Sequence, residues 1–301
     1  PLAGARIVFP GPKLDGASLC ELIEQESVTM SAGVPTIWAG LIEHVIAKKL
    51  KFTTFKRTVI GGSTCPPAMI QAFGKEGIDV IHAWGMTELS PVGSVARLKQ
   101  KDLAKSQAEQ QLILAKQGRP MFGVDMKIVD EKGQALPHDG VAFGDLMVKS
   151  NWAIDTYFGV SESPLIEGWF PTGDVATLDP DSNMQITDRS KDVIKSGGEW
   201  ISSIELENVA SAHPEVAMAA CIAIAHPKWD ERPLLVVVKR DTATSDDDTM
   251  KAKLLEMLAK KVAKWWLPDD IVFVKQIPLT ATGKMAKLKL REEFVTYQWP
   301  V

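Results

Sequence analysis

The chain has 301 residues, of which 45% are hydrophobic and 24% are charged. This composition excludes a disordered chain and a coiled coil, and the length suits two folded domains. Because 34 Lys and Arg stand against 38 Asp and Glu, for a net charge of -4, the basic surface of a nucleic-acid-binding protein is not expected.

The cysteines and the first residue give expectations about where the protein is located and whether the chain is a fragment. Cys20, Cys65 and Cys221 are far apart and lack a C-x-x-C spacing, so they predict neither a disulfide framework nor a zinc site and fit a cytoplasmic protein. No apolar run reaches the roughly 18 to 20 residues of a membrane span. The start at Pro1, without an initiator Met, suggests a fragment.

The first third of the chain alternates between strand and helix patterns. In order, the expected elements are a strand at 5–9, a helix from Ser18, a helix at 38–49, a strand at 58–60, a helix after Pro67, a strand at 79–83 and a polar helix at 98–117. Such alternation predicts a parallel α/β sheet whose functional loops lie at the carboxyl ends of its strands.

The rest of the chain predicts first a β-rich subdomain and then a small α+β domain. The expected elements are strands at 124–129, 144–149 and 175–178, a helix capped by Ser202 and Glu205, strands at 216–225 and 234–239, a helix from Thr249 and a strand at 271–275. The predicted organisation is a partial large domain at 1–190, divided near 118 into α/β and β-rich parts, and a small domain at 191–301.

Two segments of the predicted large domain carry polar groups that a plain core does not need. In residues 84–88, WGMTE, an aromatic ring and a glycine precede a hydroxyl and a carboxylate, groups that suit a nucleotide phosphate and Mg²⁺. In residues 170–174, FPTGD, a turn presents a carboxylate that could accept the two hydroxyls of a ribose. In isolation, a strand end with a capping threonine explains residues 84–88 about as well, and Asp174 can be an ordinary turn residue.

Two further segments lie near the predicted small domain. Residues 188–201 place dense charge before a Gly-Gly turn, as expected of a hinge beside a ligand-facing loop or of a polar linker. Residues 278–284 end in Lys284 behind a small, flexible loop, which suits delivery of a positive charge to a phosphate. A solvent-exposed lysine is the alternative for Lys284.

In this order and at these separations, the four segments resemble the motifs of the adenylate-forming superfamily of acyl-CoA synthetases, peptide-synthetase adenylation domains and luciferases. The resemblance covers nearly the whole chain. Residues 84–88, 195–202 and 226–233 look most like those of medium- and long-chain fatty acyl-CoA synthetases. The resemblance implies ATP-dependent activation of an aliphatic carboxylic acid as an acyl adenylate, followed by thioester formation with coenzyme A. It also implies Mg²⁺ as a cofactor.

The resemblance also implies roles for matching residues. It implies an adenine loop at Gly61, Gly62 and Ser63, adenine stacking on Trp84 beside Gly85, a phosphate contact from Thr87, a Mg²⁺ ligand in Glu88, ribose contacts from Asp174 and Arg189, a hinge at Lys191, a catalytic lysine in Lys284, and a CoA channel near Gly197, Gly198 and Trp200. Val34 and Trp38 are candidates for the acyl pocket, although core packing explains them nearly as well.

The chain also departs from the family pattern. The Ser/Thr/Gly-rich phosphate-binding loop has no counterpart before Gly61, so we expect a C-terminal fragment that adenylates poorly on its own. Ser63 stands where an alanine is commoner, and Trp84 replaces the usual tyrosine. Either change could alter nucleotide preference or the shape of the acyl tunnel.

Several alternatives stay open at this point. The ligase could act on a small substituted acid such as methylthiopropionate, or could transfer the acyl group to a carrier protein. The chain could also be a non-catalytic binding or assembly unit rather than part of an enzyme. Such a unit would have no chemical reason to keep Glu88, Asp174 and Lys284 together. The sequence leaves a homodimer open.

Overall fold

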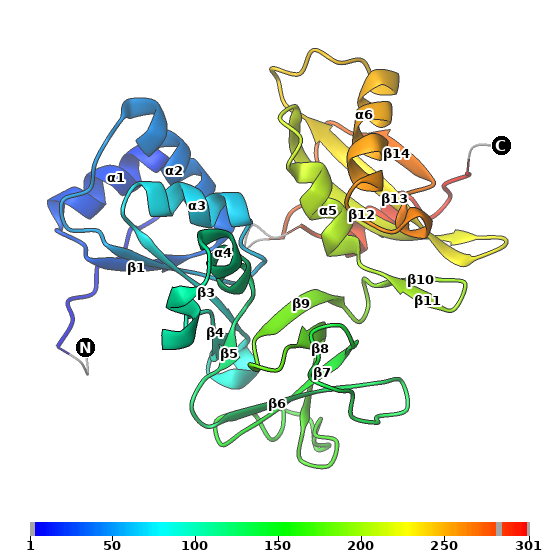
Figure 1. Ribbon diagram of the computed structural model, residues 1–301, viewed down its shortest axis with the longest axis horizontal. Helices are drawn as coiled ribbons and strands as arrows, with labels where there is room; N and C mark the ends of the chain where they lie inside the picture. The colour runs from blue at the N-terminus through cyan, green and yellow to red at the C-terminus, as the bar shows by residue number, and fades with distance from the viewer. Residues whose placement is uncertain (1–3, 281–284, 300–301) are drawn as a thin grey trace. The chain divides into compact units, whose positions relative to one another are not determined.

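The computed structural model describes residues 4–280 and 285–299, and its contacts divide the chain into two compact units (Figure 1). The first unit runs to Thr172 and also contains Thr177–Ile186. The second consists of Gly173–Ala176 and of the residues from Thr187 onward. The fold is the expected mixture of α/β and α+β structure, and a domain boundary at 190/191 stays a prediction.

A five-stranded sheet in the order β1-β2-β3-β4-β5 forms the α/β part of the first unit. Its strands are β1 (Met30–Gly33), β2 (Arg57–Ile60), β3 (Asp79–Gly85), β4 (Val92–Val95) and β5 (Arg119–Pro120). The pairs β1–β2 and β2–β3 are parallel, and the pairs β3–β4 and β4–β5 are antiparallel. The parallel alternation expected from the sequence is therefore confirmed for three strands.

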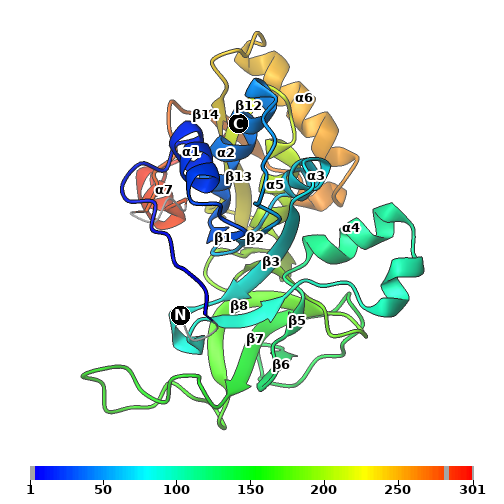
Figure 2. The ribbon, with the colours of Figure 1, turned by 90° about the vertical axis from the view of Figure 1, so that its left-hand side faces the viewer.

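Three helices pack with the parallel strands. They are α1 (Gly16–Gln25), α2 (Pro35–Lys48) and α3 (Pro67–Lys75). All three lie near β1 to β3 in both views (Figures 1 and 2). Leu41, Phe55, Ile60 and Phe73 are at most 1% exposed in the core that they share. Burying such large side chains contributes roughly 1.5–3 kcal/mol each.

Two sequence expectations in this part are wrong. Residues 5–9 form no strand but an irregular segment before α1 (Figure 2), in which Phe9 is 83% exposed and no strand pairs with the segment. The helix expected at 98–117 is divided into η2 (Gln100–Ala104) and α4 (Gln107–Ala115). The division falls where Ser106 caps α4 by accepting a hydrogen bond from the Glu109 N–H.

A four-stranded sheet in the order β6-β7-β8-β9 follows. Its strands are β6 (Val124–Val129), β7 (Phe143–Ser150), β8 (Phe170–Leu178) and β9 (Met184–Arg189). The turn between β8 and β9 is closed by Asp179, whose Oδ1 accepts the N–H groups of Asp181 at 2.9 Å and Asn183 at 2.8 Å. The β-rich part expected from the sequence is thus present, with a longer β8 than predicted.

The second unit contains a sheet in the order β11-β10-β13-β12, with β14 also paired to β13. Its elements are β10 (Ile194–Ser196), β11 (Glu199–Ile201), α5 (Ser203–Ser211), β12 (Val216–His226), β13 (Asp230–Lys239), α6 (Asp247–Ala259), η3 (Lys264–Trp266), β14 (Asp270–Phe273) and α7 (Lys287–Glu293). The predicted N-cap Ser202 accepts the Glu205 N–H at 3.2 Å.

Alternate residues of β12 belong to two separate apolar clusters. Ala219 and Cys221 pack with residues of α5 and α6, whereas Ala220 and Ile222 pack with Leu290 of α7. Because successive side chains of a strand point to opposite faces, the sheet is covered by α5 and α6 on one face and by α7 on the other.

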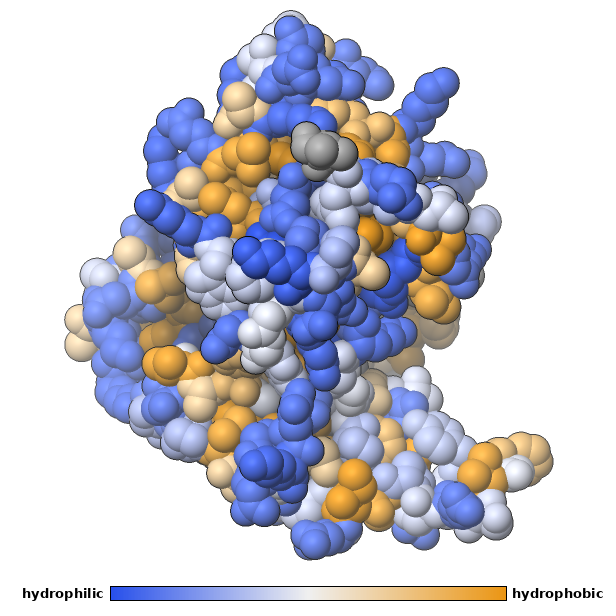
Figure 3. All heavy atoms as spheres, turned by 90° about the vertical axis from the view of Figure 1, so that its right-hand side faces the viewer, coloured by the Kyte–Doolittle hydropathy of each residue, from blue (hydrophilic) through white to orange (hydrophobic). Residues whose placement is uncertain are grey.

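The face in Figure 3 is largely hydrophilic, with several groups of apolar residues between the hydrophilic ones. Two phenylalanines of the first unit, Phe122 and Phe158, are almost fully exposed. Across residues 4–280 and 285–299, we find no helix with the length and apolar character that crossing a bilayer requires.

Candidate nucleotide and thioester site

The predicted adenine loop, residues 61–63, leaves the carboxyl end of β2 beside β3. A Cβ on Gly61 would lie 2.8 Å from the backbone oxygen of Ala83, so this position requires glycine for close approach of the two strands. Gly62 has a φ of 80°, in the left-handed region that favours glycine. Local backbone geometry therefore explains why both positions are glycine. Ser63 is exposed to solvent.

A buried histidine, which the sequence did not indicate, supports this loop. His82 of β3 accepts the Cys65 N–H through Nε2 at 3.2 Å, and its Nδ1 lies 2.9 Å from the Ala115 oxygen. These two contacts require the neutral ring with its proton on Nδ1. Burial lowers the pKa of His82 to about 4, which keeps the ring neutral at pH 7.

The residues after the loop are shaped by a bulge in the β3–β4 pair. A Cβ on Gly85 would lie 2.0 Å from the Pro91 oxygen, and the Met86 N–H donates to that oxygen at 2.8 Å. The ring of Trp84 covers Gly93, where a Cβ would approach the ring within 2.3 Å. Trp84 is thus fixed against β4 and is partly exposed.

Thr87 and Glu88 lie in the short helix η1 (Thr87–Leu89). The Tyr157 hydroxyl donates to the Glu88 Oε1 at 3.0 Å, and the Ile154 N–H donates to the Glu88 backbone oxygen at 2.9 Å. Tyr157 was not singled out from the sequence, because nothing local marks it. The Tyr157 contact orients the Glu88 carboxylate and the Ile154 contact holds its backbone, while Thr87 is exposed.

The protein side chains fit Mg²⁺ only if substrate phosphates and water complete its ligands. Within residues 4–280 and 285–299, no three His, Cys, Asp or Glu side chains are grouped to hold a metal ion. Mg²⁺ is commonly bound by one or two carboxylates together with substrate phosphates and water. A single oriented Glu88 carboxylate fits that pattern.

The predicted ribose pair lies in the second unit. Asp174 of β8 and Arg189 of β9 approach each other at 3.5 Å between Oδ1 and Nε. The Ser190 N–H donates to the Gly173 oxygen at 3.0 Å, which joins the two strands at this point. Arg189 has a half-exposed side chain, whereas that of Asp174 is mostly buried. The structure therefore brings the two predicted ribose residues together.

The predicted hinge residue follows directly. Lys191 is exposed, and the neighbouring Asp192 is buried and pairs with Arg291 at 2.7 Å. On the other side, Asp188 is buried and its Oδ2 accepts the Ser203 N–H at 2.6 Å. The exposed Lys191 thus lies between two anchored carboxylates, and its hinge role stays a prediction.

The predicted CoA segment forms the tight hairpin of β10 and β11. Gly197 and Gly198 have φ values of 60° and 86°, which explains both glycines at the turn. Beside this turn is a cavity of about 590 Å³ lined by Ser196, Gly197, Glu199, Trp229, Arg232, Trp265 and Asp269. Trp200 does not line it, but lies 5.4 Å from the Lys195 Nζ, measured to the ring centre.

Arg232 supports one wall of this cavity without offering a free charge. Its guanidinium donates to Asp269, to Ser196 and to the backbone oxygens of Trp265 and Leu267. The two tryptophans that line the cavity are each more than 40% exposed. The cavity therefore presents aromatic surface, which suits a planar or apolar ligand group.

Two predictions, the acyl pocket and the catalytic lysine, concern residues that do not belong to the groups described above. Trp38 is 3% exposed and packs against Phe55 and Phe73, so core packing accounts for it, and Val34 precedes α2 as its N-cap residue. An acyl-pocket role for either stays a prediction. Lys284 lies outside the described residues.

The segments on either side of that lysine are described. Leu279 and Met285 form an antiparallel bridge, and the Ala286 N–H donates to the Pro278 oxygen at 2.8 Å. Residues 278–279 and 285–286, which flank the segment that contains Lys284, are therefore held together.

Comparison with known proteins agrees with this fold and motif order. A model of the AMP-binding enzyme family matches residues 2–158, and a model of the AMP-binding enzyme C-terminal domain matches residues 205–284. Since the first match alone covers more than half of the chain, the protein belongs to the AMP-binding enzyme family. The resemblance noted from the four sequence segments is confirmed.

Individual relatives are similar over nearly all of the chain. The 3-methylmercaptopropionyl-CoA ligase of Ruegeria lacuscaerulensis is 54% identical over 295 residues, which cover 97% of this chain and 54% of that protein. The medium-chain-fatty-acid–CoA ligase of Ectopseudomonas oleovorans is 46% identical over 295 residues, covering 97% and 53%. The chain thus spans about half the length of these curated relatives.

A solved structure shows the same fold. The amide bond synthetase McbA from Marinactinospora thermotolerans aligns with a TM-score of 0.80 at 28% identity. The alignment covers 93% of this chain and 56% of McbA.

Proposed function

We propose that the protein is an AMP-forming acid:CoA ligase that activates a short thioether acid, 3-methylmercaptopropionate. The observation that carries the ligase assignment is the order of the four motif segments on an AMP-binding fold, together with the pairing of Asp174 and Arg189. The 54% identity to a 3-methylmercaptopropionyl-CoA ligase supports the choice of acid. This choice replaces the fatty acid that the sequence favoured first.

In the first half-reaction the acid carboxylate attacks the α-phosphorus of ATP, and pyrophosphate leaves. Thr87 is proposed to contact the α-phosphate through its exposed hydroxyl, and Lys284 to offset negative charge on the bridging oxygen. Glu88, oriented by Tyr157, would hold Mg²⁺. When bound there, Mg²⁺ neutralises phosphate charge.

Nucleotide binding is assigned to two sets of residues. Residues 61–63 provide a flat glycine-rich edge for adenine, and Trp84 provides a partly exposed ring beside it in the same sheet. Asp174 can accept hydrogen bonds from ribose hydroxyls, and Arg189 can donate to the ribose oxygens. Their mutual contact keeps both side chains oriented before ATP binds.

In the second half-reaction the CoA thiol attacks the acyl adenylate, and AMP leaves. The Gly197-Gly198 turn can admit a thin pantetheine chain because it has no side chains. The aromatic cavity beside it, with Trp229 and Trp265, suits the planar base of CoA. Lys191 is the proposed hinge between the two half-reactions. A homodimer and a cytoplasmic location stay predictions.

A medium-chain fatty acid is the second candidate substrate. It is favoured by the 46% identity to a medium-chain-fatty-acid–CoA ligase and by the resemblance of the motif segments. Both acids would use the same adenylation residues, so the two proposals differ only in the acyl pocket. A carrier protein in place of CoA would likewise leave the first half-reaction unchanged.

The test uses the complete gene product with ATP, Mg²⁺, CoA and one acid at a time. The acids are 3-methylmercaptopropionate, butyrate, octanoate and palmitate, and AMP and acyl-CoA are quantified by chromatography. We expect kcat/KM for 3-methylmercaptopropionate to exceed that for octanoate by about tenfold or more, the scale of discrimination that a hydrophobic pocket achieves. Preference for octanoate or palmitate would refute the substrate, and no AMP with any acid would refute the ligase.

A further inference from the structure

A buried ion pair in the second unit has no part in the function proposed above. The Nζ of Lys287, in the first turn of α7, lies 2.7 Å from the Oε1 of Glu207 in α5. It also donates to the Ser203 hydroxyl at 2.6 Å. Both charged side chains are nine-tenths buried or more. Three residues on two helices therefore form a compact polar cluster inside the unit.

This cluster lies at the edge of β12 that pairs with no other strand in residues 4–280 and 285–299. The Glu207 Oε1 also accepts the Cys221 N–H of β12 at 2.7 Å, and β12 pairs with β13 on its other side. Because α5 and α7 cover opposite faces of the sheet, Lys287 and Glu207 join the two helices around the edge of β12. The contact satisfies a backbone donor that an edge strand would leave unpaired.

The charge environment keeps this lysine protonated. Burial by itself would lower the pKa of Lys287, but the carboxylates of Glu207 and Asp188 hold it above its usual value. Asp188 directly precedes the proposed ribose residue Arg189 and accepts the Ser203 N–H at 2.6 Å. The cluster thus joins α7 to the strand end that carries Arg189.

Stability alone gives a weak reason for such a pair. Taking two charges out of water costs several kcal/mol, and well-packed apolar residues of the same volume are often as stable or more so. In some proteins, a charged pair with fixed hydrogen-bond partners instead specifies how the elements it joins are arranged. The function of the pair therefore depends on which segment Lys287 holds in place.

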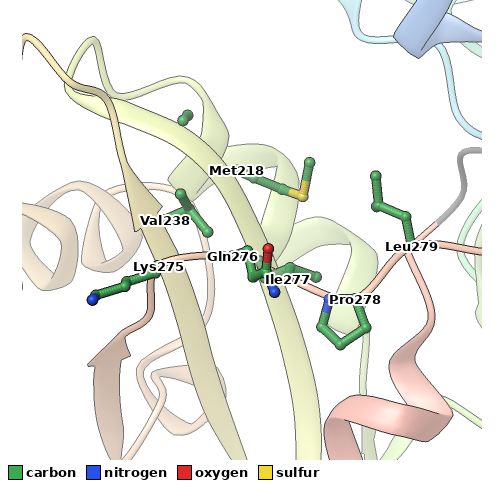
Figure 4. A pocket seen from close by; sticks show the side chains of 8 residues that line it. Met218, Val238, Lys275, Gln276, Ile277, Pro278 and Leu279 are labelled. Atoms are coloured by element: carbon green, nitrogen blue, oxygen red, sulfur yellow. The ribbon is translucent and has the colours of Figure 1, made fainter.

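The segment that Lys287 anchors begins directly after residues 281–284, which include Lys284. Lys287 follows Lys284 by three residues, and the bridge between Leu279 and Met285 closes the loop base. On the other arm, residues 275–279 line a pocket of about 460 Å³ together with Ala217 and Met218 of β12 and Val238 of β13 (Figure 4). Ile277 from this arm and Leu290 from α7 are buried in the same apolar cluster.

The two arms of the loop are thus held differently. Apolar packing of Ile277 and Leu290 holds the loop base against the sheet face, but such packing is non-directional. Lys287 adds a directional contact on the side nearest Lys284 in sequence. A second charged contact, Arg291 to Asp192 at 2.7 Å, lies one turn further along α7.

We propose that Lys287 is a positioning residue for adenylation, which fixes the base of the Lys284 loop through Glu207 and Ser203. The inference rests on the proposed function, in which Lys284 acts in the first half-reaction. The β10–β11 hairpin proposed for CoA is held separately, by its own backbone pairing and by the pairing of Ser196 with Asp230. Loss of the Lys287 contact should therefore impair adenylation and spare thioester formation.

The main test uses the double variant Lys287→Met/Glu207→Gln of the complete gene product. It removes both buried charges together, and the amide oxygen of the introduced glutamine can still accept the Cys221 N–H. We expect kcat for acid-dependent ATP–pyrophosphate exchange to fall about 10- to 100-fold, the cost of a misplacement near 1 Å. The KM for ATP and the conversion of supplied acyl adenylate to thioester should change less than about threefold.

A milder variant and a control complete the test. Ser203→Ala removes one hydrogen bond to Lys287, and we expect exchange to fall about three- to tenfold; it decides the question if the double variant does not fold. Lys289→Met removes an exposed lysine from the same helix and should leave both half-reactions unchanged. Circular dichroism and melting curves establish that each variant is folded.

The outcomes separate this inference from the proposed function. Full exchange activity in the folded double variant, or in Ser203→Ala if the double variant does not fold, would overturn the positioning role. Equal losses in both half-reactions would also overturn it, since they would indicate a general structural role. Absence of exchange in the unmodified protein would instead overturn the ligase assignment on which the inference rests.

Discussion

At the scale of single residues, the proposed nucleotide loop depends on a side chain that never needs to touch the nucleotide. His82 joins the Cys65 N–H to the Ala115 oxygen, and it can do so only as a neutral ring. Protonation would remove the acceptor from Nε2 and would place a charge in the core. The loop that follows β2 is therefore coupled to pH through one histidine.

This coupling predicts a loss of stability in acid. A histidine in the unfolded chain titrates near pH 6.5, whereas the folded protein protonates His82 only near pH 4. As pH falls below 6.5, the unfolded state gains the proton first. The stabilising contribution is thus complete above pH 6.5 and is lost as pH falls to about 4, by about 3 kcal/mol at 1.36 kcal/mol per pKa unit.

The measurement is denaturant unfolding at pH 7 and pH 4.5 for the unmodified protein and for His82→Gln. Glutamine does not titrate, and its amide can replace both hydrogen bonds. We expect the variant to lose about 2–3 kcal/mol less than the unmodified protein over this interval. An identical acid dependence in both proteins would show that His82 does not control it.

At the scale of elements, close contact between β2 and β3 sets the geometry of the adenine loop. Gly61→Ala would place a Cβ 2.8 Å from the Ala83 oxygen, which is backbone and can yield only by moving β3. We expect a stability loss of about 1–3 kcal/mol. We also expect a higher KM for ATP, because the displaced loop borders the proposed adenine site.

Gly40→Ala is the matched control for this prediction. Gly40 lies inside α2, where an added Cβ would meet nothing within 4 Å. Alanine should there stabilise the helix by roughly 0.5–1 kcal/mol and leave the KM for ATP unchanged. Thermal unfolding and initial rates are measured on both variants. The strand contact would be refuted if Gly61→Ala behaved like Gly40→Ala.

Much of the fold could be predicted at this scale because local patterns carry it. The strand before Gly61, the Ser202 cap of α5 and the β-rich turns each have a short-range signal. The expected strand at 5–9 was wrong because an apolar run does not specify a pairing partner. β1, with the sequence MSAG, was missed because its short strand has no alternating apolar pattern.

The candidate site likewise contains residues that a local motif predicts and residues that depend on distant partners. Asp174 and Arg189, 15 positions apart in the chain, were predicted from motif order and do approach each other at 3.5 Å. His82, Tyr157 and Lys287 were not predicted, because their roles depend on partners that are 17 to 84 residues away in sequence. No local pattern reports a tertiary hydrogen bond.

At the scale of the whole molecule, the proposed residues belong to two compact units. The adenine loop, Thr87 and Glu88 belong to the first unit, and Asp174, Arg189 and the CoA hairpin belong to the second. The two half-reactions make different demands, because a lysine that stabilises leaving pyrophosphate has no task once AMP is the leaving group. We therefore expect the two half-reactions to be separable by mutation, even where their proposed residues belong to the same unit.

The most direct test of this account is Lys284→Ala in the complete gene product, with each half-reaction measured separately. The variant should lose acyl-adenylate formation, with ATP–pyrophosphate exchange reduced about 100-fold or more, the scale expected when one preorganised charge is removed. Conversion of supplied 3-methylmercaptopropionyl adenylate to its CoA thioester should continue at the unmodified rate. Equal loss of both steps would contradict the assigned role of Lys284.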